Sequence, residues 1–268
     1  MTELKDRTVL VTGATGGFGS EMTRQFLAAG CRLVLTDLSQ AALESLRDAQ
    51  GDDAGRIVAL IPADLSTDAG ASEIRRGCAE AGIVPDVLVN NAGIAVAGRL
   101  DHVPQERWET LLSINLLAPM RLTNLFLPAM IERRSGHIVN ISSLAGWVGS
   151  PGLTSYCASK FGLRGFAEAL AVDVEEFDIA VSTVYPFFSR TPILDSPQFG
   201  YDEKRKIPDD LVTEPADVVA RIVAGIRRNR RHIFPDRTAR IVHYLVRFAP
   251  WATTLMNRRL EALATKAA

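Results

Sequence analysis

TVLVTGATGGFG, residues 8–19, joins an aliphatic run to a loop with four glycines, and a helical pattern follows at residues 18–29. Glycine permits backbone angles and close approaches that other residues forbid. At a strand-to-helix turn it lets a pyrophosphate lie against the free amide groups of the helix N-terminus. We therefore predict a dinucleotide-binding turn, with an ordinary glycine-rich turn as the alternative. Its predicted cofactor contacts are Gly13, Thr15, Gly16, Gly17, Phe18 and Gly19.

The rest of the chain repeats this alternation of short apolar runs and longer helical patterns. Strands are predicted at residues 8–11, 32–36, 57–61, 87–90, 137–141, 180–185 and 232–234. Helical patterns lie near residues 18–29, 40–49, 68–81, 104–133 and 155–176. The strands are apolar on both faces, as in a parallel sheet covered by helices. The pattern predicts an α/β fold with a doubly wound parallel sheet of about seven strands in one domain, residues 1–236.

Composition excludes several classes of protein. The chain has 268 residues, 47% of them hydrophobic, and a net charge of −1, so no global field draws it to nucleic acid. The cysteines are three in number and form no CxxC pair, which favours a reducing, cytoplasmic location. No histidine and cysteine spacing predicts a metal site. We expect neither a signal peptide nor a transmembrane helix.

An acidic residue follows the second predicted strand. Asp37 closes RLVLTD, 18 residues beyond Gly19, where a carboxylate can accept hydrogen bonds from the adenosine ribose. It would repel a 2′-phosphate, and neither Leu38 nor Ser39 supplies a cation. We predict NAD rather than NADP, with Asp37 and Leu38 as cofactor contacts. The alternative is that Asp37 caps the following helix.

Four motifs in order, TGATGGFG, NNAG (90–93), ISS (141–143) and YCASK (156–160), resemble the short-chain dehydrogenase/reductase family over about residues 5–235. The resemblance implies a Rossmann-type sheet, hydride transfer between a nicotinamide and a hydroxyl or carbonyl group, and a homo-oligomer, either dimer or tetramer. It also implies a catalytic tetrad of Asn115, Ser143, Tyr156 and Lys160. The family's spacing to the tyrosine selects Ser143 rather than Ser142.

The spacing of Tyr156 and Lys160 has a chemical reason beside the resemblance. Residues i and i+4 share one helix face, so the lysine can lie next to the phenol. A phenol ionises near pH 10, and a neighbouring cation favours the phenolate. We expect Lys160 to lower the pKa of Tyr156 and make it an acid/base group, while Ser143 holds the substrate oxygen. An ordinary helix surface is the alternative.

Asn115 lies four residues before Pro119 inside a long helical pattern. A proline there removes the hydrogen bond to the carbonyl at i−4, which is that of Asn115. The freed carbonyl can bind a water, which in the family links Lys160 to solvent. Alternatively, Pro119 kinks the helix and Asn115 is a bystander.

Further contacts follow from the resemblance. It places Asp64 and Leu65 beside the adenine, the loop Asn91, Ala92 and Gly93 along the cofactor, Lys160 on the nicotinamide ribose, and Thr191 on the carboxamide. The family usually has glycine directly after the proline at 186. Phe187 stands there instead and is expected to narrow the pocket or displace the loop that carries Thr191.

The segment after Pro186 is rich in aromatic and aliphatic residues. Phe187 and Phe188 are the predicted substrate contacts, facing Val96, Trp147, Val148 and Leu153. An apolar wall around one Ser/Tyr pair suits a lipophilic alcohol or ketone. Arg190 and Lys204–Lys206 could instead meet an anionic tail. Two other functions remain open: an NADPH-dependent reductase of carrier-bound 3-oxoacyl chains, and a non-catalytic cofactor-binding protein.

Residues 221–260 contain ten arginines and a single acid, Asp236. Within them, residues 240–260 interleave arginine with aliphatic and aromatic residues. We predict a basic helical extension over residues 237–268, in which residues 240–260 resemble an interfacial helix pair, broken at Pro250, that could make peripheral membrane contact. The alternative is that these helices cover the substrate cleft or a subunit interface.

Overall fold

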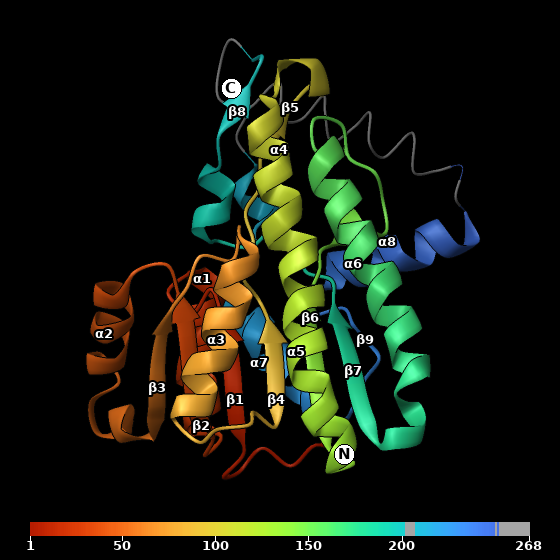
Figure 1. Cartoon of the computed structure of the whole chain (residues 1–268). Coiled ribbons are helices and arrows are strands. Elements are labelled where there is room, and N and C mark those ends of the chain that lie inside the picture. Colours follow the sequence, from red (N-terminus) through yellow and green to blue (C-terminus); the bar gives the residue numbers. More distant parts are fainter. Residues whose placement is uncertain (202–206, 250, 252–268) are drawn as a thin grey trace.

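The centre of the fold is a seven-stranded parallel sheet with helices on both faces (Figure 1). A computed structural model describes residues 1–201, 207–249 and 251. The strand order is β3-β2-β1-β4-β6-β7-β9. The strands are β1 Thr8–Thr12, β2 Arg32–Asp37, β3 Ile57–Pro62, β4 Val87–Asn90, β6 Gly136–Ile141, β7 Ile179–Val184 and β9 His232–Ile233. All seven predicted strands and the doubly wound fold are confirmed.

Eight α-helices are present in the described residues. They are α1 Gly17–Ala28, α2 Gln40–Asp48, α3 Asp68–Glu80, α4 Gln105–Leu112, α5 Ala118–Glu132, α6 Thr154–Asp173, α7 Pro215–Arg227 and α8 Arg237–Phe248. Strand side chains alternate between two apolar clusters. Val9 and Val11 pack with α1 and α7 on one face, whereas Leu10 packs with α3 and α5 on the other. This alternation explains why the strands are apolar throughout.

The order in which successive strands are added to the sheet reverses between β1 and β4. From β1 the order runs through β2 to β3 on one side and through β4, β6 and β7 to β9 on the other. In open parallel sheets, ligands bind outside the carboxyl ends of the strands at such a switch point. The glycine turn after β1 and the NNAG loop after β4 therefore meet at one place.

Two features differ from the predicted elements. A second sheet pairs β5, Ala97–Gly98, with β8, Gln198–Phe199, and such two-residue strands carry no readable period. The predicted helix 104–133 is divided by a π-helical turn, Ser113–Leu117, between α4 and α5.

The run Gln105–Glu132 passes a test of length and composition for crossing a membrane, with a mean hydropathy of 1.3, as no other helix among the described residues does. Several of its apolar side chains nevertheless pack into the core, although Leu117 and Met120 are exposed. Leu122, Phe126 and Met130 are at most 1% exposed and lie in the cluster formed with β4 and β6. We interpret it as a core helix.

Candidate active site

The glycine turn is shaped by close backbone approaches. Gly13 has φ +64°, and a Cβ there would lie 2.8 Å from the Ala92 Cα. Gly16 precedes α1 without a capping side chain, so the amide groups of the first helical turn have no side-chain acceptor. Those amides and the positive end of the helix dipole suit a pyrophosphate. The turn therefore fits the dinucleotide that its sequence predicts.

Gly19 gives a direct test of this packing. A Cβ there would collide with the Gly13 carbonyl oxygen and approach the Ala14 backbone. We expect Gly19→Ala to lower the free energy of unfolding by about 2 kcal/mol and to weaken NADH binding, because the turn must shift. The control is Gly55→Ala, since nothing lies within 4 Å of its added Cβ. Urea unfolding and calorimetric titration measure the two effects; equal stability of both variants would contradict the account.

Asp37 ends β2 beside the glycine turn. Its Oδ2 accepts hydrogen bonds from Thr15 Oγ1 (2.6 Å) and Thr15 N (2.9 Å), and its Oδ1 accepts one from Leu38 N (2.8 Å). A carboxylate has about four acceptor positions, so capacity remains for a ribose hydroxyl. The alternative that Asp37 caps α2 is wrong, because Ser39 is that cap and accepts from Ala42 N.

The other predicted cofactor contacts lie along the same edge of the sheet. Asp64 and Leu65 follow β3, and Leu65 is buried. Asn91 fastens the NNAG loop to β1, since its Nδ2 donates to the carbonyl oxygens of Thr12 (2.8 Å) and Gly13 (3.1 Å). The Asn91 side chain therefore holds the NNAG loop against the end of β1.

Thr191 reaches the glycine turn despite the phenylalanine at 187. A Cβ on Gly17 would lie 2.5 Å from Thr191 Cγ2, so the two loops touch. The segment after Pro186 thus lies against the start of α1. The expectation that Phe187 displaces Thr191 from this region is wrong in this structure.

Tyr156 and Lys160 lie one turn apart in α6, and Lys160 Nζ is 5.5 Å from the centroid of the Tyr156 ring. Lys160 is 4% exposed and donates a hydrogen bond to the Ile141 carbonyl oxygen at 3.0 Å. Gly93 approaches the same ammonium, since its added Cβ would be 3.5 Å from Nζ. The alternative of an ordinary helix surface is therefore wrong.

The pKa values differ from the sequence-based expectation. Burial raises the pKa of Tyr156 to about 12, and a hydrogen bond with Ser143 acts in the opposite direction. Burial also lowers the pKa of Lys160 to about 8. The expected lowering of the Tyr156 pKa is thus wrong for the protein alone, because both groups lose hydration together. Tyr156 is a protonated acid at neutral pH.

Asn115 is fully buried in the π-helical turn. Its Oδ1 accepts from Ile94 N and its Nδ2 donates to Ile94 O, both at 2.9 Å, while Nδ2 also lies 3.3 Å from Ser159 Oγ. Pro119 follows within the first turn of α5, where the hydrogen-bond ladder widens. The amide side chain therefore joins α6 to the loop after β4.

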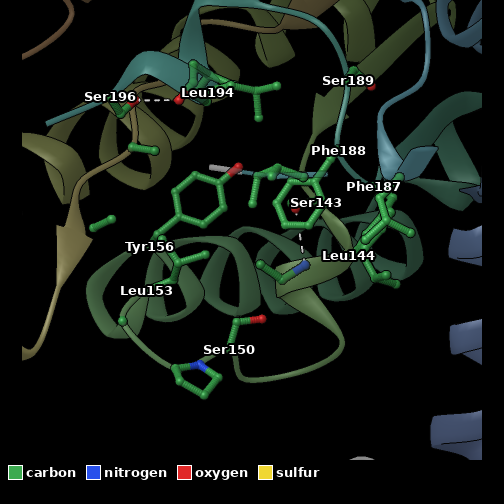
Figure 2. A pocket seen from close by; sticks show the side chains of 18 of the residues that line it. Ser143, Leu144, Ser150, Leu153, Tyr156, Phe187, Phe188, Ser189, Leu194 and Ser196 are labelled. Atoms are coloured by element: carbon green, nitrogen blue, oxygen red, sulfur yellow. Dashed lines mark hydrogen bonds between the residues drawn. The ribbon is translucent and has the colours of Figure 1, made fainter. Parts of the chain in front are cut away.

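Ser143 and Tyr156 share the inner wall of a cavity of about 410 Å³. Figure 2 shows the Tyr156 hydroxyl directed into it, with Ser143 and Phe188 beside it and Leu194 above. Ser143 Oγ accepts a hydrogen bond from Ala145 N at 3.1 Å, which fixes its rotamer. Phe187 and Phe188 line the cavity as predicted, with ring centroids 4.4 Å apart.

Two residues that were predicted to face Phe187 and Phe188, Val96 and Trp147, do not line the cavity. Val96 lies in an apolar cluster with Val103 and Leu111, behind the cavity wall. Trp147 lies under α8, with its ring centroid 4.4 Å from that of His243. Sequence position could not separate the residues beside the cavity from those one layer behind it.

Asp236 is a residue that the sequence reasoning missed. It caps α8, accepting from Ala239 N at 2.6 Å, and its other oxygen accepts from Phe187 N at 3.0 Å. Asp236 is 7% exposed. The helix thereby braces the loop that follows Pro186. The available signal was a lone acid, after a proline, in an arginine-rich stretch.

This arrangement matches a known family. A family model described as short chain dehydrogenase matches residues 7–198. The chain belongs to the short-chain dehydrogenase family. It is therefore an oxidoreductase with a nicotinamide dinucleotide site, and the motifs that carried the resemblance lie within or beside the cleft described above.

Similar short-chain dehydrogenases differ in the cofactor they hold. Nodulation protein G of Rhizobium meliloti (strain 1021) is 38% identical over 208 residues, covering 77% of this chain and 82% of that protein. A short-chain dehydrogenase from Sphingobium yanoikuyae in complex with NADPH is 26% identical, with a TM-score of 0.77 and coverage of 94% and 95%. A 3-oxoacyl-[acyl-carrier protein] reductase from Brucella melitensis with bound NAD is 25% identical, with a TM-score of 0.73 and coverage of 87% and 90%.

Proposed function

We propose that this protein transfers a hydride between NAD and a lipophilic secondary alcohol or ketone, with Tyr156 as general acid/base. The observation that carries the proposal is the shared cavity wall: Ser143 and Tyr156 lie together in the lining of a mainly apolar cavity, with the Tyr156 hydroxyl directed into it. Such a site fixes one oxygen and accepts a hydrocarbon body. A panel of secondary alcohols and ketones with NAD and NADH tests it.

The side chains of the site have separate roles in the proposed reaction. When bound, the nicotinamide supplies the hydride acceptor for oxidation and the hydride donor for reduction. In reduction, Tyr156 donates its proton to the carbonyl oxygen, and Ser143 donates a hydrogen bond to that oxygen. In oxidation, the Tyr156 phenolate takes the hydroxyl proton. The Lys160 charge favours that phenolate, and Asn115 holds the loop that faces Lys160.

NAD is preferred over NADP in this proposal because of Asp37. Its carboxylate stands at the end of β2, where the adenosine ribose of a dinucleotide is held in folds of this type. The similar proteins include both NADPH and NAD complexes, so the choice depends on this chain's own residues.

A double substitution tests the choice. We expect Asp37→Ala with Leu38→Arg to move the ratio of kcat/KM values towards NADP by about a hundredfold, because it removes a repulsion and adds a phosphate partner. Thr15 loses its acceptor, so both cofactors bind less tightly, and the ratio is the informative quantity. Leu38→Gln is the matched control. An unchanged ratio in the double variant means that Asp37 does not select the cofactor.

A reductase of carrier-bound 3-oxoacyl chains is the second candidate, since one similar structure is named for that activity. Comparison of free ketones with carrier-linked substrates separates the two. Arg190, which was considered as a partner for an anionic tail, pairs with Asp209 (3.2 Å) and Glu214 (2.9 Å). Residues 204–206 lie outside the described residues.

We also propose a homo-oligomer and a cytoplasmic location. Leu117, Met120 and Phe161 are 38%, 39% and 42% exposed on the helical run 105–132 and on α6, which suits a subunit contact. The three cysteines are free and buried, as in a reducing compartment. A monomer at micromolar concentration in light scattering would contradict the oligomer.

A further inference from the structure

Helix α8 has two faces of different character. Thr238 and Val242 line the substrate cavity, and Ala239 is buried beneath the helix. The opposite side, here called the outer face of α8, is exposed. It consists of Arg237, Arg240, Ile241, Tyr244, Arg247 and Phe248. Figure 1 shows α8 extending outward past α6 on the side of the sheet where the strands end.

The apolar side chains of the outer face are largely exposed. Ile241 is 55% exposed, Tyr244 59% and Phe248 75%, and Trp251 just beyond the helix is 77% exposed. These three helical residues are spaced i, i+3 and i+7, so they form one stripe. Tyr244 and Phe248 stack with ring centroids 6.4 Å apart.

The charge of the outer face has one sign. Arg237, Arg240 and Arg247 flank the stripe, and among the described residues none of them forms an ion pair. Arg247 lies over the Phe248 ring, 6.0 Å from its centroid. The single acid at this helix, Asp236, is buried as the N-cap and faces the Phe187 amide. The face therefore combines cations with aromatic groups and offers no exposed carboxylate of its own.

This combination of arginines and exposed apolar side chains favours an anionic membrane over a second copy of the chain. In a symmetric contact between two copies, the same patch meets itself, so six arginines would gather without acids from the patch. An anionic bilayer instead supplies phosphates at the level of the guanidinium groups and an acyl boundary for the aromatic stripe. We propose that the outer face of α8 docks this protein on an anionic membrane surface.

The docking geometry has a consequence for the substrate. The same helix that contacts the bilayer on one side walls the cavity on the other, through Thr238 and Val242. A lipophilic alcohol or ketone dissolved in the membrane would then reach the cavity over a short path. This route of the substrate to the cavity rests on the proposed function, whereas binding to vesicles does not.

Co-sedimentation of the full chain with vesicles tests the proposal. The probes are vesicles of equal parts phosphatidylcholine and phosphatidylglycerol, and vesicles of phosphatidylcholine alone. We expect binding to the anionic vesicles that falls as salt is raised, and much weaker binding to the neutral ones. The variant Arg237→Gln/Arg240→Gln/Arg247→Gln should bind about a hundredfold more weakly. The variant Ile241→Ser/Phe248→Ser should weaken binding at all salt concentrations.

A matched control removes three exposed arginines from other helices, as Arg24→Gln/Arg76→Gln/Arg107→Gln, and should bind as the wild type does. Tyr156→Phe should also bind vesicles normally, which separates this proposal from the catalytic one. The proposal is overturned if the wild type stays in the supernatant with anionic vesicles at low salt. It is also overturned if the control variant loses as much vesicle binding as the triple arginine variant of α8. A third contradicting outcome is that the α8 substitutions change the oligomer mass in light scattering and leave vesicle binding unchanged.

Discussion

Replacement of Tyr156 by phenylalanine is expected to lower turnover by about a thousandfold and to leave NADH binding nearly unchanged. The substitution removes the proton that the carbonyl oxygen receives, and general acid/base catalysis contributes roughly 10²–10⁴ in rate. The ring stays, so the packing of α6 against the cluster of Val96, Val103 and Leu111 is retained. Turnover on the best ketone of the panel and calorimetric titration of NADH measure the two effects.

The matched control is Tyr244→Phe, which removes a phenol that is 59% exposed on α8 and distant from the chemistry. It should keep wild-type turnover on a soluble ketone. If Tyr156→Phe keeps more than about a tenth of the wild-type rate, Tyr156 is not the acid/base group.

Replacement of Lys160 by methionine is expected to abolish most turnover and, at neutral pH, to stabilise the fold. Burial lowers the pKa of Lys160 to about 8 from an ordinary 10.5. Holding the ammonium inside therefore costs about 3 kcal/mol of unfolding free energy. Loss of the hydrogen bond to the Ile141 carbonyl offsets about 1 kcal/mol, which leaves a net gain of about 2 kcal/mol.

The gain in stability from Lys160→Met is expected to decrease as the pH rises. Below pH 8 the lysine is charged in both states, so its cost to the wild-type fold is fully present. As the pH rises from about 8 towards 10.5, the folded state loses the proton first and the cost declines. The stability difference between variant and wild type should shrink over that window. The raised pKa of Tyr156 acts above pH 10 and is common to both proteins.

Urea unfolding at pH 7 and at about pH 9.5 measures the difference, with Lys5→Met, an exposed lysine, as the control. The account is contradicted if Lys160→Met is less stable than the wild type at pH 7. A stability gap that is independent of pH would show that the ammonium is not the cause.

Local signals in the sequence predicted most of the fold. Val9, Leu10 and Val11 are apolar in succession because each face of the sheet has its own helical layer, and this pattern identifies buried parallel strands. The glycine turn was predictable because Gly13 and Gly19 allow contacts that other residues cannot make. The tetrad was predicted from the resemblance of four motifs to those of the short-chain dehydrogenase family, and only the Tyr156 and Lys160 pair has a reason in helix spacing as well.

The remaining features depend on contacts between distant segments. The direction of the Tyr156 pKa shift is set by burial, which spacing along a helix does not determine. Trp147 and Val148 are neighbours in sequence, yet Val148 lines the cavity and Trp147 packs under α8. The second role of Asp236 joins residues 49 positions apart. The proposed second helix after Pro250 lies outside the described residues and stays a prediction.

The most direct test measures the transfer of the hydride, as deuterium, from an alcohol to the cofactor. Wild-type protein is incubated with NAD and a panel of lipophilic secondary alcohols that carry deuterium on the carbinol carbon, and the mass of the recovered cofactor is measured. The account predicts that at least one alcohol transfers its deuterium to the cofactor with the wild type, and that Tyr156→Phe yields almost none. If the wild type binds NADH but no alcohol labels the cofactor, and no ketone of the panel oxidises NADH, the central claim is contradicted.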